Sequence, residues 1–297
     1  MIQKMQQAAD RLRLGVQIAF TALTNGYLWG FLTGKIYRGP LKTVCVPGLN
    51  CYSCPGALGS CPIGSLQAVL GSRDYKFSFY IVGFLMLMGS VFGRLVCGWL
   101  CPFGMVQDLL YKIPARKKRK NLPGHGALIR AKYVILMVLV ILLPLTVRDL
   151  SGQGSPWFCK YLCPSGTLSA GIPLVLKNPS LQKAVGILFS WKVALLVAIL
   201  IFSVMVYRPF CKYLCPLGAV YSLFNSVAVY RYEVDQEKCT KCGICKRTCK
   251  MDIKVWEQPN SPECIRCGEC IRACPEHAVR KSRLHSAPSA DSWTSKN

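Results

Sequence analysis

Two matched runs of cysteines near the C-terminal end constrain this chain more than any other feature. The spacing in each run is two, two and three residues: Cys239, Cys242, Cys245 and Cys249 in the first, and Cys264, Cys267, Cys270 and Cys274 in the second. The chain holds 18 cysteines in 297 residues and is too long and too apolar for a small secreted disulfide scaffold. Short cysteine clusters in such a chain indicate metal ligands.

The spacing of both runs is that of bacterial ferredoxins that bind two [4Fe–4S] clusters. Three closely spaced thiolates wrap one face of a cubane, and tight turns at Gly243 and Gly268 let backbone amides approach the sulfurs. The fourth cysteine of each run lies too far along the turn and serves the other cluster. We therefore assign Cys239, Cys242, Cys245 and Cys274 to one cluster, and Cys264, Cys267, Cys270 and Cys249 to the other. Zinc knuckles are the alternative, but a zinc site needs only four ligands in two separated pairs.

The rest of the chain has the composition of a membrane protein. The mean hydropathy is +0.31, and four apolar segments approach the ~20 residues that a spanning helix needs: 12–34, 77–97, 131–150 and 184–207. The formal charge is +24, from 37 Lys and Arg against 13 Asp and Glu. A nucleic-acid-binding protein would carry this charge on one face of a soluble domain. The long apolar runs instead favour basic loops on one side of a bilayer.

The loop between the second and third segments sets the expected orientation. It is rich in Lys and Arg and holds no acidic residue: Lys112, Arg116, Lys117, Lys118, Arg119, Lys120, Arg130 and Lys132. Such a loop is expected on the cytoplasmic side, although a DNA- or lipid-binding patch has the same composition. The N-terminus would then lie inside, 35–76 and 151–183 outside, and everything after about 208 inside.

A second cysteine motif repeats through the apolar part of the chain. The pattern Cys-x3-Cys-Pro-x-Gly occurs three times, beginning at Cys97, Cys159 and Cys211 and with its second cysteine at Cys101, Cys163 and Cys215. A degenerate copy keeps Cys61-Pro62-Ile63-Gly64, has Ala57 in the place of the first cysteine, and has Cys51 and Cys54 just upstream. One motif follows each apolar segment, so the chain is predicted to consist of two tandem halves.

The proline in each motif predicts a helix start. Proline is tolerated at the first helical position, because its missing N–H would have no partner there. Pro102, Pro164 and Pro216 are therefore expected to open short helices with a cysteine at each start. The partial positive charge at that end stabilises an anionic thiolate cluster.

The predicted topology places these motifs at both faces of the membrane. Cys97, Cys101, Cys211 and Cys215 would share the cytoplasmic side and match one [4Fe–4S] site. The outer side would hold Cys51, Cys54, Cys61, Cys159 and Cys163, with Cys45 nearby. We expect a second membrane cluster with three ligands from 51–61 and one or two from the Cys159/Cys163 pair. The alternatives are a Cys159–Cys163 disulfide, copper or zinc binding, and, for Cys45, a small apolar side chain.

The order of these motifs resembles a known family. The run from Phe92 to Gly104, the run from Arg208 to Gly218 and the module after them are similar to the membrane polyferredoxins. That family includes the quinol dehydrogenase membrane subunit of periplasmic nitrate reductase, the membrane half of the nitrous-oxide reductase regulator and the cytochrome oxidase accessory protein. The resemblance covers about 77–283. It implies four or more spans, cytoplasmic [4Fe–4S] clusters, and electron transfer between a cytoplasmic or quinone pool and an outer-side redox partner.

Together these features predict an all-α polytopic membrane protein with a C-terminal α+β two-[4Fe–4S] ferredoxin-like domain. The expected parts are a transmembrane domain (1–230) with about four spans and short re-entrant or interfacial helices after the Cys-Pro motifs, a cytoplasmic ferredoxin domain (231–283) and a disordered tail (284–297). The expected location is a bacterial or archaeal cytoplasmic membrane, with the N-terminus inside.

The expected function is electron transfer as one subunit of an oxidoreductase complex rather than as a stand-alone enzyme. Two [4Fe–4S] clusters in the C-terminal domain and one or two more in the membrane domain would carry electrons to an outer-side partner. A flavoprotein, a cytochrome or a periplasmic reductase is the expected partner, quinone is a further candidate, and nucleic acid is not expected. The alternative is a maturation factor for a metalloenzyme, in which the membrane cysteines hold metal transiently or cycle between thiol and disulfide.

Overall fold

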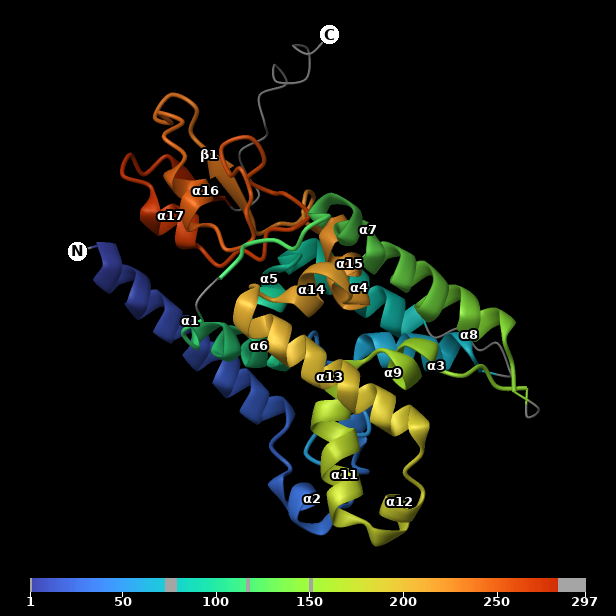
Figure 1. The fold of residues 1–297 in the computed structure, drawn as a ribbon. Helices are drawn as coiled ribbons and strands as arrows, with labels where there is room; N and C mark the ends of the chain where they lie inside the picture. The colour runs from blue at the N-terminus through green and yellow to red at the C-terminus, as the bar shows by residue number, and fades with distance from the viewer. Residues whose placement is uncertain (1, 73–78, 116–117, 150–151, 283–297) are drawn as a thin grey trace.

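The computed structural model describes residues 2–72, 79–115, 118–149 and 152–282 (Figure 1). Its N-terminal half contains α1 (Ile2–Thr24), α2 (Leu28–Thr33), a 3₁₀ turn (Pro40–Thr43), α3 (Pro62–Leu70), α4 (Phe79–Phe92), α5 (Leu95–Trp99), α6 (Pro102–Lys112), α7 (His125–Ile135), a π-helical segment (Leu136–Leu142) and α8 (Leu143–Thr146). The other half contains α9 (Trp157–Tyr161), α10 (Pro164–Gly166), a π-helical segment (Thr167–Gly171), α11 (Ile172–Lys177), α12 (Pro179–Lys183), α13 (Ile187–Met205), α14 (Pro209–Tyr213), α15 (Pro216–Phe224), β1 (Arg231–Val234), α16 (Ile244–Thr248), α17 (Glu269–Ala273) and β2 (Val279–Ser282). The described part is therefore mostly helical, as expected.

Two of the described helices are long and apolar enough to cross a membrane. One is the continuous helix His125–Thr146, formed by α7, the π-helical segment and α8, and the other is α13. They correspond to the predicted segments 131–150 and 184–207. Much of their apolar surface is exposed: Met137 is 58% exposed and Ile201 is 58% exposed. Apolar helices with so little burial are typical of a lipid-facing surface.

The predicted segment 12–34 does not form one helix. Helix α1 begins at Ile2 and ends at Thr24, and α2 follows after a short turn. The Thr24 hydroxyl donates to the Phe20 carbonyl (2.9 Å) and the Asn25 amide donates to the Thr21 carbonyl (3.3 Å). Side chains that bond the backbone locally in this way favour helix ends. The expectation of a single first span is corrected to two helices with a turn between them.

The predicted segment 77–97 is also divided. Helix α4 ends at Phe92, and Gly93 has a φ of +52°, a left-handed conformation that favours glycine. The Arg94 amide then donates to the Asn225 side chain (3.2 Å) instead of continuing the helix. Helix α4 has 14 residues, which corresponds to about 21 Å at ~1.5 Å per residue. Residues 77 and 78 lie outside the described residues, so a span here stays a prediction.

The four Cys-Pro motifs open helices as their sequences predict. Helices α3, α6, α10 and α15 each begin at the motif proline, with the preceding cysteine at the N-cap. The helix that begins with α10 continues through the π-helical segment into α11. Each motif therefore places a thiol where unpaired backbone N–H groups point.

The C-terminal region is a small α+β unit. Strands β1 and β2 pair antiparallel, with Arg231 opposite Ser282 and Val234 opposite Val279. Helices α16 and α17 pack against each other beside them. Both helices start after a glycine in the left-handed conformation, Gly243 at φ +74° and Gly268 at φ +78°. The predicted tail 284–297 and the basic residues Arg116 and Lys117 lie outside the described residues.

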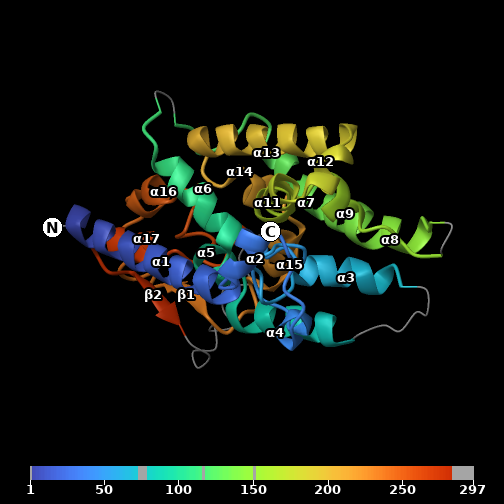
Figure 2. The ribbon, with the colours of Figure 1, turned by 90° about the horizontal axis from the view of Figure 1, so that it is seen from below.

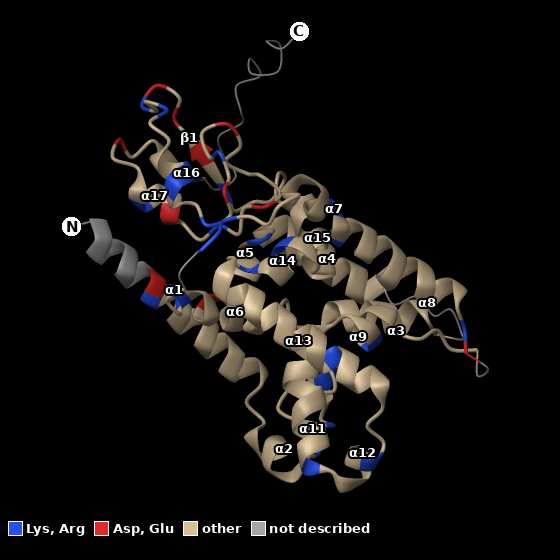
Figure 3. Ribbon diagram, in the orientation of Figure 1, with Lys and Arg blue, Asp and Glu red and all other residues tan. Residues whose placement is uncertain are grey.

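The two parts of the chain lie along one long axis. Figure 1 shows α16, α17 and β1 at one end and α2, α11 and α12 at the other, with α1, α7 and α13 running between them. Figure 2 shows α13 and α4 on opposite sides of the short helices α14 and α15. Most of the acidic residues lie at the end that carries β1, as Figure 3 shows. Helices α14 and α15 therefore lie between the longer helices α13 and α4.

Candidate metal centres

The structure brings the first expected cysteine quartet together at the C-terminal end. Cys239, Cys242, Cys245 and Cys274 line one pocket, together with Gly243 and Pro275. Cys274 comes from the second run, so this pocket holds three cysteines of the first run and the last cysteine of the second. Gly243 lies between Cys242 and Cys245, and its left-handed φ makes the tight turn that places both thiols on one wall.

The second quartet combines three cysteines of the second run with the last cysteine of the first run. Cys249, Cys264, Cys267 and Cys270 line a second pocket. Burial raises the pKa of Cys264 to about 11 and that of Cys267 to about 12. Their thiols are therefore protonated at neutral pH until a metal displaces the protons. Tyr207, from the helical part of the chain, lines the same pocket.

A third quartet is buried among the short helices, below the ferredoxin-like end. We call Cys97, Cys101, Cys211 and Cys215 the inner quartet, and none of the four is more than 5% exposed. Burial, together with the neighbouring thiolates of Cys101 and Cys97, raises the pKa of Cys211 to about 12. Burial and the thiolates of Cys211, Cys97 and Cys101 raise the pKa of Cys215 as well. The two motifs thus contribute two thiols each to one site.

Two fully buried arginines flank the inner quartet in a reciprocal arrangement. Arg94, which precedes the first motif, donates to the carbonyl of Cys211 (3.1 Å). Arg208, which precedes the second motif, donates to the carbonyl of Cys97. A [4Fe–4S] cluster with four thiolates is anionic, so these positive charges suit it. Sequence reasoning did not assign either arginine a role, although both lie within three residues of a motif cysteine.

A fourth quartet lies around the starts of α3 and α10. Cys51, Cys61, Cys159 and Cys163, the outer quartet, line one cavity of about 860 Å³. Burial, together with the thiolates of Cys51 and Cys61, raises the pKa of Cys163 to about 12. Cys51 thus takes the place of the first cysteine that the degenerate motif lacks. The expectation from spacing is three ligands from 51–61, whereas the cavity is lined by two cysteines from that stretch and by both cysteines of the Cys159/Cys163 pair.

Cys54 and Cys45 lie outside the outer quartet. The Cys54 thiol points to the Asn25 side chain (3.8 Å) and packs with Ala57 and Ala170. Cys45 is 4% exposed, and its sulfur lies 3.7 Å from the hydroxyl of Ser60. Neither residue lines the cavity in the described part of the chain. We therefore leave Cys54 out of the ligand set that we propose, and Cys45 keeps its expected role as a small buried side chain.

The residues around the two buried quartets fit a cubane. Among the described residues, no group of three or more His, Cys, Asp or Glu is gathered closely enough to hold a single metal ion. Each iron of a cubane binds one thiolate, so its four sulfurs surround a cluster and do not converge on one point. The motif glycines leave room beside the sulfurs: a Cβ at Gly166 would lie 3.5 Å from the Cys51 sulfur and 3.7 Å from the Cys163 sulfur. Backbone amides of Gly166 and Gly218 donate to Cys163 and Cys215 (both 3.4 Å).

Close backbone contacts join the ferredoxin-like domain to the inner quartet. A Cβ on Gly98, the residue after Cys97, would clash with the carbonyl oxygen of Ile265, the residue after Cys264. The Trp99 indole donates to the carbonyl of Arg266 (3.1 Å). Because Gly98 has no side chain, the backbone next to Cys97 of the inner quartet can contact the backbone next to Cys264 of the second C-terminal quartet.

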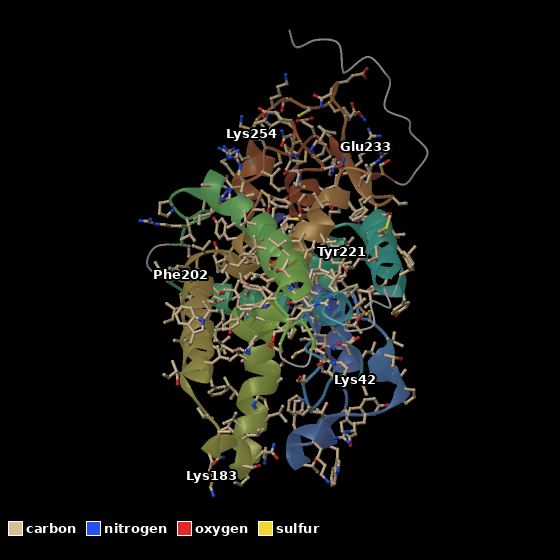
Figure 4. The ribbon with its side chains drawn as sticks, turned by 90° about the vertical axis from the view of Figure 1, so that its right-hand side faces the viewer. Lys42, Lys183, Phe202, Tyr221, Glu233 and Lys254 are labelled. Carbon is tan, nitrogen blue, oxygen red and sulfur yellow. The ribbon has the colours of Figure 1, made fainter. Side chains whose placement is uncertain are left out.

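A similar contact joins the inner and outer quartets. A Cβ on Gly48 would lie 3.2 Å from the Cα of Cys101, and Cys51 follows three residues later. The Tyr221 hydroxyl donates to the carbonyl of Pro47 (3.0 Å). Burial raises the pKa of Tyr221, and the nearby thiolates of Cys97 and Cys61, one from each quartet, raise it further. In Figure 4, Tyr221 lies between Lys42 and the labelled ferredoxin-like residues.

Comparisons with known proteins match the motifs. A family model described as a 4Fe-4S binding domain matches 77–121, 133–178 and 188–229, the segments that hold the three complete motifs. A second model of the same description matches 259–280. An uncharacterized protein of Methanocaldococcus jannaschii is 30% identical over 204 residues, which cover 66% of this chain and 74% of that protein.

The chain belongs to the polyferredoxin family. The regulatory protein NosR of Pseudomonas aeruginosa is 29% identical over 166 residues, 52% of this chain and 20% of NosR. The methylamine utilization ferredoxin-type protein MauN of Methylobacillus flagellatus is 29% identical over 175 residues, 57% of this chain and 51% of MauN. The match to this polyferredoxin thus covers about a fifth of the length of NosR and about half of the length of MauN. No solved structure matches it. The family predicted from the motifs is confirmed.

Proposed function

We propose that this polyferredoxin carries electrons through a membrane along four [4Fe–4S] sites in series. The observation that carries the proposal is the succession of four cysteine quartets, with close contacts between neighbouring quartets at Gly98 and Gly48. When bound, the clusters would supply one-electron transfer. The ligands would be the two quartets of the C-terminal domain, the inner quartet and the outer quartet.

The side chains between the sites support this order. Gly98 and Trp99 join the second C-terminal quartet to the inner quartet, and Tyr221 and Gly48 stand between the inner and outer quartets. The roles of these residues are to exclude water and to hold consecutive sites in fixed contact. Consistent with this, Gly48 meets the backbone of Cys101 and Gly98 meets the backbone of Ile265, and neither contact depends on a flexible side chain.

The surface supports a membrane position. The helix His125–Thr146 and α13 expose large apolar side chains, and Figure 4 shows Phe202 on the outer face of α13, where it is 48% exposed. We propose that the ferredoxin-like end lies in the cytoplasm, because the basic loop before α7 favours that side. The cavity at the outer quartet would then face an outer-side redox partner. The polyferredoxin would act as a subunit of a redox complex.

Iron and sulfide counting tests the cluster number. We expect about sixteen irons per chain after anaerobic purification in detergent, since four cubanes hold four irons each. Cys97→Ser and Cys159→Ser should each remove about four irons and one EPR signal of the reduced protein. Cys54→Ser is the matched control, because its thiol is buried near Cys51 but outside the quartet, and it should keep the full iron content.

Two outcomes would contradict the proposal. About eight irons in the wild-type chain would leave only the C-terminal pair. Unchanged iron content in both Cys97→Ser and Cys159→Ser would remove the membrane clusters, whatever the wild-type total.

A further inference from the structure

Two buried glutamines occupy the same position in different motifs. Gln67 lies six residues after Cys61 and Gln107 lies six residues after Cys101, so both follow the pattern Cys-Pro-x-Gly-x-x-Gln. Both side chains are 0% exposed. The equivalent positions in the second half of the chain hold Ser169 and Tyr221.

The two glutamines make the same three hydrogen bonds. The Gln67 amide nitrogen donates to the Cys159 sulfur (3.3 Å) and to the Ile63 carbonyl (3.3 Å), while its oxygen accepts from the Phe158 backbone amide (3.0 Å). The Gln107 amide repeats this pattern with the sulfur of Cys211 (3.1 Å), the carbonyl of Phe103 (3.4 Å) and the backbone amide of Phe210 (3.2 Å). Each glutamine thus joins its own motif to the first cysteine of the partner motif.

The backbone contact fixes which end of each amide faces the sulfur. A backbone N–H can only donate, so the atom beside Phe158 or Phe210 must be the glutamine oxygen. The NH₂ group must then point to Cys159 or Cys211. Because a buried amide loses free energy when a donor or acceptor is left unpaired, the alternative orientation is disfavoured at both sites.

We propose that Gln67 and Gln107 are positioning residues that set the reduction potentials of the outer and inner membrane clusters. The inference rests on the proposed function, because it needs clusters at both quartets. A hydrogen bond to a ligand sulfur stabilises the more negative, reduced state and so raises the potential. Each glutamine acts on one quartet alone.

Redox titration of Gln67→Met and Gln107→Met tests the assignment. Methionine has a similar length and no N–H donor. In Gln107→Met we expect the midpoint potential of the inner cluster to become more negative and that of the outer cluster to stay unchanged, and in Gln67→Met the reverse. Each variant is the control for the other, and Cys97→Ser and Cys159→Ser identify which EPR signal belongs to which cluster.

A measurement on the wild-type chain avoids dependence on variant folding. With glutamine labelled by ¹⁵N at its side-chain amide, pulsed EPR of the reduced protein should detect ¹⁵N coupled to both membrane clusters. Unaltered potentials in both variants with about sixteen irons retained, or no ¹⁵N coupling at either cluster, would overturn the glutamine assignment alone. About eight irons in the wild type would overturn the proposed function and this inference with it.

Discussion

Asp108→Asn should destabilise the helical part of the protein by about 3–5 kcal/mol, the usual cost of leaving a buried charge without its partner. Asp108, in α6, is 5% exposed and accepts from Arg208 at both oxygens (2.7 and 2.5 Å). It also pairs with Arg13 (3.4 Å). Asparagine would leave the buried guanidinium of Arg208 without a negative partner, and Arg13 would keep only Asp10 (3.9 Å). Thermal unfolding of the purified variant in detergent measures the loss.

The pH dependence of that stability has a defined sign. Burial alone would raise the pKa of Asp108, but Arg208 and then Arg13 outweigh it, so the pKa lies below the usual value of 3.8. A carboxyl with a lower pKa in the folded state stabilises the fold fully above the unfolded value, and this contribution is lost as the pH falls through the folded value. The wild type should therefore keep its full advantage over Asp108→Asn above pH ~4 and lose this part of it as the pH falls below that value.

Asp235→Asn is the matched control for Asp108→Asn. Asp235 pairs with Arg280 (2.7 Å), and the Arg280 side chain is 57% exposed. An exposed ion pair contributes about 0–1 kcal/mol, so this variant should unfold close to the wild-type temperature. Equal destabilisation by the two variants would contradict the view that the buried network at Asp108 stabilises the inner motifs.

Gly98→Val should disconnect the ferredoxin-like domain from the inner quartet. The valine Cβ would clash with the carbonyl oxygen of Ile265. This oxygen belongs to the backbone, so it cannot move aside as the end of a flexible side chain could. The domain must then shift, which increases the distance between its clusters and the inner cluster. We expect electron transfer from the C-terminal clusters to the inner cluster, followed by rapid mixing and freeze-quench EPR, to slow several-fold, with the iron content unchanged.

Gly83→Val is the control for Gly98→Val. Gly83 lies in α4, and nothing lies within 4 Å of the position that its Cβ would take. The Gly83→Val variant should transfer electrons from the C-terminal clusters to the inner cluster at the wild-type rate. A wild-type rate in Gly98→Val would mean that electrons do not pass through this contact.

The local chemistry of this protein could be predicted from its sequence, but the pairing of distant motifs only in part. The spacing of Cys239 to Cys274 determines which cysteines a short loop can bring together, and Pro102 and Pro216 mark helix starts by their missing N–H. Cys51 and Cys54 both lie within ten residues of Cys61 along the chain, so spacing alone does not choose between them. Only the fold separates them, by directing Cys54 towards Asn25 and Cys51 towards Cys163.

The division of the first two apolar segments was missed for a related reason. Mean hydropathy over about twenty residues does not change where a single residue ends a helix. The Asn25 side chain ends the first helix in this way, and the left-handed backbone at Gly93 ends the second. Gln67 and Gln107 were missed because a buried glutamine has no distinctive pattern until its partner motif is known. Their shared place six residues after a Cys-Pro cysteine was the available signal.

Transfer across a sealed vesicle tests the central proposal most directly. Proteoliposomes would carry the protein with its ferredoxin-like end outside, an impermeant reductant outside and ferricytochrome c trapped inside. We predict that the trapped cytochrome c is reduced by wild type and not by Cys97→Ser or Cys159→Ser. If wild type, with all its clusters reduced, left the trapped cytochrome c oxidised, the series of sites through the membrane would be contradicted.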